Sequence, residues 1–527
     1  MADHTELRPS IGPGEILPLA ARRNPDMVAL ICDDQQLTYR QLDDLSAALA
    51  VALGRRGIGP GDVVSLYGQN SWEWIVSYHG ALRAGAVVNP INVMLTRDEL
   101  RYVLSDCKAK VLFAGAAQLP TALSANDGEP LTDLVFSSAD CSTPGVMSLT
   151  ELIDDGRGSP PPSLTPQPAD LCSIAYTSGT TGHPKGAMQS HQSVLLNCAL
   201  TAAMHGRTAT DVMVTALPSA HVYGNVAINS TFLAGGAVVL MERFDPSTAL
   251  SLIDKWHATM FEGVPAMYSM MLSHPALEGA DLTSLRCSTV GGQTLPVSVL
   301  NAWQERTGAP LLELWGMTEI AGLGATHAIY SPPAPGSIGV SLPGVQLRVA
   351  DLDSGERELG PSERGELQVR GPLVMQGYFG RPDATAEVLR PDGWLRTGDV
   401  AYCDESGHFF VVDRTKDMIV TAGYNVYPAE IERVIATHPD VALVAVGRRP
   451  DEVRGEVAVA YVVLRDGAML TEDGVIDFCR DKLAAYKRPR AVVFTDALPT
   501  TSSGKIMRRK LIDIDSHDSA GAASARG

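Results

Sequence analysis

Residues 176–186 contain the residue types that best suit the binding of a phosphate group. They read Tyr-Thr-Ser-Gly-Thr-Thr-Gly-His-Pro-Lys-Gly and begin where an apolar run, 171–176, predicts a β-strand. Glycine permits a tight turn that brings backbone N–H groups close to phosphate oxygens. Hydroxyl and ammonium groups add further donors. We therefore expect phosphate groups to be held by Thr177, Ser178, Gly179, Thr180, Thr181 and Lys185.

This segment differs from the two best-known nucleotide-binding loops. It is no Walker A loop, because Pro184 stands where that motif has glycine and Gly186 where it has serine or threonine. It also lacks the spacing of a dinucleotide-binding fingerprint. The alternative is an ordinary polar turn, which is what most runs rich in glycine and threonine form.

Five segments in a fixed order resemble the adenylate-forming enzymes, which include acyl-CoA synthetases, aryl-CoA ligases, luciferases and peptide-synthetase adenylation domains. They are residues 176–186, 314–320, 393–399, 421–431 and 498–509. The resemblance extends from about Ala29 to Lys510. It implies ATP, Mg²⁺ and coenzyme A as cofactors. It also implies two steps, in which an acyl-adenylate forms with release of pyrophosphate and a thioester then forms with release of AMP.

The resemblance assigns roles in the segment Leu-Trp-Gly-Met-Thr-Glu-Ile at 314–320. Trp315 would stack on adenine, Thr318 would contact the α-phosphate, and Glu319 would hold Mg²⁺. A carboxylate suits that last role, because Mg²⁺ is a hard cation that prefers oxygen ligands. Gly292 and Gln293 would line the same nucleotide site.

Further along the chain, the resemblance implies that Asp399 binds the ribose hydroxyls together with Arg414. Lys416 corresponds to the hinge about which the C-terminal domain rotates between the two steps. Lys505 would reach the reacting carboxylate and the α-phosphate, where an ammonium group can stabilise developing charge. We expect Lys505, His221, Thr318 and Glu319 to be the catalytic residues.

Contacts to coenzyme A are expected at the turn that contains Gly423 and Tyr424, since glycine permits close approach of the narrow pantetheine arm. Plant aryl-acid ligases carry lysines at the positions of Val420 and Ala422, so their coenzyme A contacts do not transfer directly. Arg243 stands where some relatives bind the nucleotide of coenzyme A.

The resemblance places His221, Asn225, Gly291 and Gly316 around the acid. Three absences narrow the substrate: there is no Asp at 222 to pair with an amino group, no Trp at 316 to fill the pocket, and no Arg at 314 to hold a second carboxylate. Burying an unpaired charge is costly, so amino acids and diacids are disfavoured. The remaining candidates are medium-chain, long-chain or aryl monocarboxylic acids.

Alternating helix and strand patterns up to about Pro343 predict an α/β fold of helix-covered parallel sheets, followed by strands from Gln346 to Val412. We expect an N-terminal domain at 1–415, with a β-rich subdomain, and a small mobile α+β domain at 416–527. The residues from about 515 onward are mostly Ser, Ala, Gly and Asp, and predict a disordered tail.

The 527 residues carry a net charge of −18, which gives no electrostatic reason to bind nucleic acid or an anionic membrane. Residues 212–241 contain no Lys, Arg, Asp or Glu, but prolines, asparagines and a Gly-Gly pair interrupt them, so we expect no membrane span. The N-terminus lacks the pattern of a signal peptide. The eight cysteines form no Cys-x-x-Cys pair, and reduced thiols in the cytoplasm are expected. A homodimer is compatible with the sequence.

Three alternatives remain at this point. The acyl group could pass to the pantetheine of a carrier protein instead of to coenzyme A. An oxygenase of the luciferase type shares the same segments. A non-catalytic nucleotide-binding protein is disfavoured, because five charged residues expected at the nucleotide site are all present: Lys185, Glu319, Asp399, Arg414 and Lys505.

Overall fold

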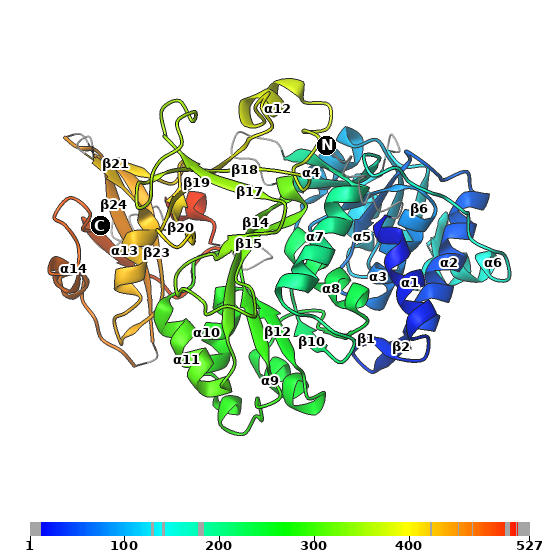
Figure 1. Cartoon of the computed structure of the whole chain (residues 1–527), viewed down its shortest axis with the longest axis horizontal. Helices are drawn as coiled ribbons and strands as arrows, with labels where there is room; N and C mark the ends of the chain where they lie inside the picture. The colour runs from blue at the N-terminus through cyan, green and yellow to red at the C-terminus, as the bar shows by residue number, and fades with distance from the viewer. Residues whose placement is uncertain are drawn as a thin grey trace, which may run out of the picture.

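The computed structural model describes residues 12–127, 131–139, 143–177, 184–421, 424–451, 453–465, 467–500, 506–512 and 514. The strands form four sheets, and helices pack on the two largest. In Figure 1 the N-terminal helices α1–α3 (blue) lie at one end of the molecule, and α13, α14 and β21–β24 (orange) lie at the other. The α/β fold expected from the sequence is confirmed.

The first large sheet has seven strands in the order β7-β6-β5-β3-β4-β8-β9. All neighbours are parallel except β8 and β9. From β3 the chain forms β4 on one side and then β5 on the other, so the winding direction reverses between β3 and β5. The strands are β3 (Val63–Tyr67), β4 (Val87–Pro90), β5 (Ala109–Ala114), β6 (Leu134–Ser137), β7 (Val146–Ser148), β8 (Leu171–Thr177) and β9 (Lys185–Ser190).

The second large sheet has nine strands in the order β16-β15-β14-β13-β12-β10-β11-β1-β2. Its centre is parallel, and antiparallel strands close both edges. The strands are β1 (Val28–Cys32), β2 (Gln35–Thr38), β10 (Val212–Thr215), β11 (Ala237–Leu240), β12 (Met260–Gly263), β13 (Cys287–Val290), β14 (Leu311–Met317), β15 (Gly322–Thr326) and β16 (Val340–Ser341).

Helices α1–α11 belong to these two sheets, and one large apolar core runs between them. Thr38 with Gln41, and Thr96 with Glu99, have the sequence pattern of a capping box; both boxes form, and each begins a helix. The helices are α1 (Ile16–Arg23), α2 (Tyr39–Arg55), α3 (Trp72–Arg83), α4 (Arg97–Asp106), α5 (Leu119–Ala125), α6 (Leu149–Gly156), α7 (His191–Met204), α8 (Val222–Ala234), α9 (Pro246–Lys255), α10 (Pro265–Ser273) and α11 (Val297–Thr307). Short 3₁₀ turns are η1 (Pro13–Glu15), η2 (Pro275–Glu278), η3 (Thr318–Ile320) and η4 (Arg508–Lys510).

Two smaller sheets follow. An antiparallel sheet contains β17 (Gln346–Ala350), β18 (Gly365–Arg370), β19 (Leu395–Cys403) and β20 (Phe409–Arg414), with α12 (Pro382–Val388) in one connection. The last sheet contains only residues beyond 416 and has its own apolar core. Its elements are β21 (Ile419–Thr421), β22 (Tyr424–Val426), α13 (Pro428–Ile435), β23 (Val441–Asp451), β24 (Gly455–Leu464), α14 (Glu472–Arg480) and β25 (Ala491–Phe494).

The uncharged stretch 212–241 forms strand β10, a loop, helix α8 and strand β11. Within the described part of the chain, no helix is both long enough and apolar enough to cross a membrane.

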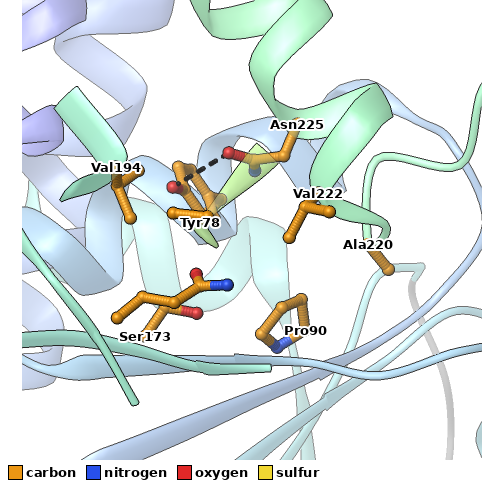
Figure 2. A pocket seen from close by; sticks show the side chains of 9 residues that line it. Tyr78, Pro90, Ser173, Val194, Ala220, Val222 and Asn225 are labelled. Atoms are coloured by element: carbon orange, nitrogen blue, oxygen red, sulfur yellow. Dashed lines mark hydrogen bonds between the residues drawn. The ribbon is translucent and has the colours of Figure 1, made fainter. Parts of the chain in front are cut away.

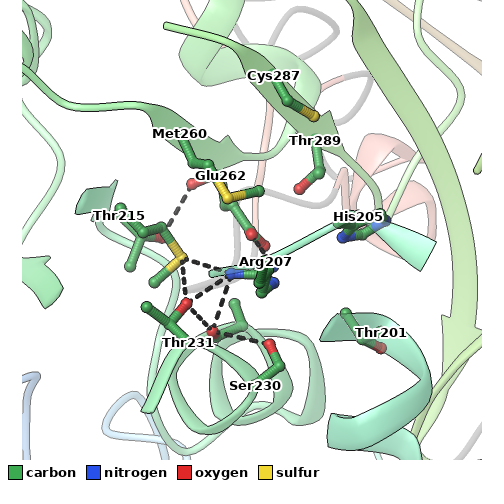
Figure 3. A network of polar contacts seen from close by, with 12 residues as sticks. Thr201, His205, Arg207, Thr215, Ser230, Thr231, Met260, Glu262, Cys287 and Thr289 are labelled. Atoms are coloured by element: carbon green, nitrogen blue, oxygen red, sulfur yellow. Dashed lines mark hydrogen bonds and ion pairs between the residues drawn. The ribbon is translucent and has the colours of Figure 1, made fainter. Parts of the chain in front are cut away.

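A buried pair of charged side chains lies between the nine-stranded sheet and helix α8 (Figure 3). The guanidinium of Arg207, which follows α7, forms an ion pair with Glu262 on β12, and both side chains are buried. Arg207 also donates to the hydroxyl of Thr231 on α8 at 2.6 Å. The hydroxyl of Thr215 on β10 donates to the Glu262 carbonyl at 2.9 Å. The pair therefore joins β10, β12 and α8.

We expect Glu262→Ala to destabilise the protein by about 3–5 kcal/mol, because it leaves a buried guanidinium without a counter-charge. Urea unfolding of the wild type and the variant measures this change. The double variant Arg207→Met/Glu262→Leu should recover most of the loss, because apolar residues of similar size can replace a buried ion pair. A double variant as unstable as the single one would contradict this account.

Candidate active site

Three of the predicted nucleotide-binding residues meet at one carboxylate. The indole Nε1 of Trp315 on β14 donates to Asp399 Oδ2 on β19 at 2.7 Å. Arg414 Nε on β20 lies 3.2 Å from the other oxygen, Oδ1. The β19–β20 register pairs Asp399 directly with Arg414. A hydrogen bond and an ion pair thus orient the carboxylate expected to bind ribose.

Glu319 lies in the η3 turn directly after β14, and its side chain is buried. Its Oε1 accepts a hydrogen bond of 2.8 Å from the Tyr378 hydroxyl. Burial raises the pKa of Glu319, the Tyr378 hydrogen bond and Arg414 lower it, and Asp399 raises it further. The carboxylates of Glu319 and Asp399 therefore lie close enough for their charges to interact. A bound cation would stabilise the charged form of this carboxylate.

Lys185, at the start of β9, lies close to the same tyrosine, Tyr378. Its Nζ lies 5.3 Å from the centre of the Tyr378 ring and 4.0 Å from Glu387 Oε2. Thr177 at the end of β8 donates through its hydroxyl to the Lys185 carbonyl at 3.5 Å. The lysine of the first segment and the acid of the second thus share Tyr378.

Buried amides fix the turn that presents Thr318 and Glu319. Gln189 Nε2 donates to the Thr318 carbonyl at 2.8 Å. Asn197 on α7 donates to the carbonyls of Ile320 (3.1 Å) and Leu323 (2.9 Å). Ala321 has a φ of +57°, a left-handed conformation that non-glycine residues adopt only when their surroundings impose it. These contacts hold the turn at the end of β14.

The residues present fit a Mg²⁺ ion that is held mainly by the substrate. Among the described residues, no group of three or more His, Cys, Asp or Glu side chains could hold a metal ion. Mg²⁺ commonly binds through one or two carboxylates together with substrate phosphates and water. Glu319 would supply that carboxylate. When bound, the ion would neutralise phosphate charge.

Six predicted site residues lie outside the described residues, and their roles stay predictions: Ser178, Gly179, Thr180, Thr181, Gly423 and Lys505. Both flanks of Lys505 are described. Thr500 and Ile506 form an antiparallel bridge, and Met507 N donates to the Pro499 carbonyl at 2.8 Å.

A narrow cavity lies between α8 and the η3 turn (Figure 2). The volume open to the centre of a water molecule is about 10 Å³, which is room for about one water. The predicted substrate residue Asn225 lines it and accepts a hydrogen bond of 3.3 Å from the Tyr78 hydroxyl. His221 begins α8, and its Nδ1 accepts from Tyr223 N at 3.3 Å. The lining consists of Tyr78, Pro90, Ser173, Gln189, Val194, Ala220, Val222, Asn225 and Ala321.

Gly316 and Gly291, both expected near the acid, are closely packed against neighbouring groups. A Cβ atom added to Gly316 would lie 2.1 Å from the Gly322 carbonyl oxygen of the neighbouring strand β15. One added to Gly291 would lie 2.2 Å from Leu314 Cδ1. Both glycines permit close packing around β14. The missing side chain of Gly316 allows close packing between β14 and β15, and the expected contacts of both glycines with the acid stay predictions.

We expect Gly316→Ala to reduce adenylation of long and short acids by the same factor. The added methyl group must displace the β15 backbone, which moves Trp315 and raises KM for ATP. Pyrophosphate release with a long and a short acid, compared as kcat/KM, measures this effect. A loss confined to long acids, with KM for ATP unchanged, would restore the acid-facing interpretation.

The predicted nucleotide residues Gly292 and Gln293 follow β13, at the same end of the sheet as the β14 turn. For coenzyme A, Arg243 is largely exposed, 3.9 Å from Glu242, and Tyr424 stacks on Tyr486 with ring centres 4.7 Å apart. No contact described here tests their roles. Lys416 lies in the turn between β20 and β21.

An arginine connects the segment that follows Lys505 to both sides of the expected hinge. Arg508 lies 3.6 Å from Asp413 on β20, 3.3 Å from Asp417 beyond the hinge, and 2.7 Å from Glu432 on α13. Burial, opposed in part by the charge of Arg508, raises the pKa of Asp413 to about 6. In this arrangement Arg508 connects the segment after residue 505 to residues on both sides of Lys416.

Sequence reasoning missed Tyr378, Gln189, Asn197 and Arg508. Tyr378 stands in Gln-Gly-Tyr-Phe-Gly at 376–380, where the flanking glycines could have drawn attention to a loop tyrosine. The amides gave no signal, because an isolated Asn or Gln beside an apolar run is common in any fold.

Comparison with known proteins agrees with this geometry. Residues 17–379 match the model of the AMP-binding enzyme family, and residues 430–505 match that of the AMP-binding enzyme C-terminal domain. A feruloyl-CoA synthase from Amycolatopsis sp is 38% identical over 93% of this chain and 96% of its own length. A long-chain-fatty-acid–CoA ligase from Bacillus subtilis is 33% identical over 95% and 94%.

Solved structures show the same fold. The anthranilate CoA ligase AuaEII in complex with anthranoyl-AMP superposes with a TM-score of 0.89 at 28% identity, over 96% of this chain and 97% of that one. ATP-bound MatB from Rhodopseudomonas palustris gives a TM-score of 0.85 at 31% identity, over 95% and 98%.

The chain belongs to the AMP-binding enzyme family. Within it, the chain is an acid–thiol ligase of the AMP-forming type that uses ATP and coenzyme A.

Proposed function

We propose that this ligase activates a medium-chain, long-chain or aryl monocarboxylic acid. The observation that carries the proposal is the uncharged lining of the small cavity beside the η3 turn, which contains no Lys, Arg, Asp or Glu. The cavity would have to widen to admit the acid. A second carboxylate or an ammonium group would have no charged partner there, and its burial would be costly. Tyr78, Ser173, Gln189 and Asn225 offer uncharged hydrogen-bonding groups, which suit the ring substituents of an aryl acid.

In the proposed mechanism, Asp399 orients the ribose and Trp315 contacts the adenine. Lys185 and the preceding loop hold the phosphates, and Glu319 would hold Mg²⁺, which would neutralise phosphate charge. Lys505 stabilises the charge that develops when the acid carboxylate attacks the α-phosphate and pyrophosphate leaves. The thiolate sulfur of coenzyme A then attacks the acyl carbon, and AMP leaves.

We further propose that domain 416–527 rotates about Lys416 relative to domain 1–415 between the two steps. The separate sheet and core beyond 416, and the Arg508 contacts on both sides of the hinge, support this division. A cytoplasmic location is also proposed. It is supported by the seven cysteines in the described segments, all of which are free thiols.

A panel of aryl and aliphatic acids with ATP, Mg²⁺ and coenzyme A tests the function, with pyrophosphate release and product mass as readouts. A CoA thioester of a monocarboxylic acid as the best product supports the proposal. A diacid or an amino acid as the best substrate would overturn the substrate class. A parallel reaction with a pantetheine-loaded carrier protein tests the other thiol acceptor, and light emission with a luciferin would indicate the oxygenase.

A further inference from the structure

Helix α4 contacts the chain on both sides of the predicted phosphate-binding segment. Tyr176 lies near the end of β8, and Pro184 directly precedes β9. The Tyr176 hydroxyl donates to Asp106 Oδ2 at 2.6 Å, and the Pro184 carbonyl accepts from the Tyr102 hydroxyl at 3.3 Å. Because Asp106 and Tyr102 both belong to α4, one helix holds the ends of the two strands between which the segment runs.

Arg381, directly before α12, joins these two contacts. Its Nη2 donates to Asp106 Oδ1 at 2.9 Å and to the Tyr102 hydroxyl at 3.1 Å. Its backbone N donates to the Tyr378 carbonyl at 3.0 Å. Since the Tyr378 hydroxyl donates to the carboxylate of Glu319, the chain of contacts extends from α4 to the predicted Mg²⁺ ligand.

Asp106 is the last residue of α4, a position where the helix itself disfavours an acid. The C-terminal end of a helix carries a partial negative charge, and the last turn of α4 has no basic residue to offset it. The Asp106 side chain is only 14% exposed, and the arginine that compensates its charge comes from 275 residues further along the chain. The local requirements of the helix therefore do not explain this acid, whereas its contacts to Tyr176 and Arg381 do.

A glycine on the neighbouring strand makes room for the tyrosine. The β8–β9 register pairs Tyr176 with Gly186 and Thr177 with Lys185. A Cβ atom added to Gly186 would lie 3.1 Å from Tyr176 Cζ, so the ring occupies the place of the absent side chain. Burial and the hydrogen bond to Asp106 raise the pKa of the Tyr176 hydroxyl, which therefore stays protonated and donates at neutral pH.

We propose that Asp106 is a positioning residue for ATP: with its partners it fixes the ends of β8 and β9, on which Thr177 and Lys185 lie. This inference rests on the proposed function, in which Thr177 and Lys185 contact phosphate. Hydroxyl and ammonium groups bind phosphate oxygens only at short range, so their placement decides how much they contribute. Asp106 contacts Tyr176 and Arg381, and it acts through them.

Steady-state kinetics of Asp106→Asn and Tyr176→Phe test the proposal, with pyrophosphate release as the readout. We expect each variant to raise KM for ATP by about tenfold and to leave KM for the acid unchanged, because the two changes remove the charge and the hydroxyl of one charge-assisted hydrogen bond. The double variant should be no worse than the more affected single variant, since both residues act through one contact. The matched control Asp98→Asn, exposed in the first turn of the same helix, should leave both KM values unchanged.

Thermal melting distinguishes positioning from a general structural role. A lower Tm with an unchanged ratio of the two KM values would overturn the proposal, and so would wild-type KM for ATP in both single variants. Equal increases in the two KM values, or additive losses in the double variant, would overturn it as well.

Lys185→Ala separates this inference from the proposed function on which it rests. If Lys185→Ala raises KM for ATP while Asp106→Asn and Tyr176→Phe do not, the positioning role is wrong and the phosphate contact stands. If Lys185→Ala leaves KM for ATP unchanged, the assignment of Lys185 to phosphate is wrong, and the positioning role fails with it.

Discussion

Glu319→Gln is expected to lower kcat/KM for adenylation by about 10²–10³-fold, because it removes the charge that holds Mg²⁺ against the phosphates. Glutamine keeps an acceptor for the Tyr378 hydroxyl, so the η3 turn should stay in place. Pyrophosphate release as a function of Mg²⁺ concentration measures the effect. The variant should need more Mg²⁺ for half-maximal rate.

Tyr378→Phe is the matched control. It keeps the carboxylate and removes only the 2.8 Å hydrogen bond, whose net contribution is about 0.5–1.5 kcal/mol. Its rate should therefore fall by no more than about tenfold. Similar losses and unchanged Mg²⁺ dependence in the two variants would mean that Glu319 has a structural role and does not hold the ion.

Lys505→Ala is expected to lower the adenylation rate by about 10³-fold while thioester formation from supplied acyl-AMP largely survives. The physical reason is that, in the proposed mechanism, the ammonium group stabilises charge only in the first displacement and then moves away with its domain. Separate assays of the two half-reactions measure this difference.

The variant should fold, because the chain on either side of position 505 is held by the Thr500–Ile506 bridge and by Arg508. Lys510→Ala, five residues further along and exposed, is the matched control and should leave both steps unchanged. Equal loss of the two half-reactions in Lys505→Ala would contradict the assignment of this lysine to adenylation.

Local sequence determined much of the secondary structure. Thr38 and Thr96, each followed three residues later by Gln or Glu, predict helix starts, and both capping boxes form. The sequence also predicts a strand at Val63–Tyr67, a helix at Trp72–Arg83 and a strand at Ala491–Phe494, and the structure shows the same bounds. These features depend on neighbours within a few residues, so the sequence pattern is sufficient to predict them.

The family and its cofactors were also accessible from sequence, because phosphate loops and metal carboxylates stand in short contiguous segments. The direction in which a residue faces in the folded protein was not accessible from sequence. Gly316 suggested room for a large acid, yet its missing side chain allows β15 to approach within van der Waals distance. A glycine in a sequence does not reveal which neighbour occupies the place of its side chain.

The sequence by itself determined the fold class, the family and the residue types expected in the active site. Only the tertiary structure decided how distant segments share their contacts: Trp315 with Asp399, Lys185 and Glu319 through Tyr378, and Arg508 with residues on both sides of Lys416. The physical reason is that sheet order brings strand ends together regardless of their separation along the chain.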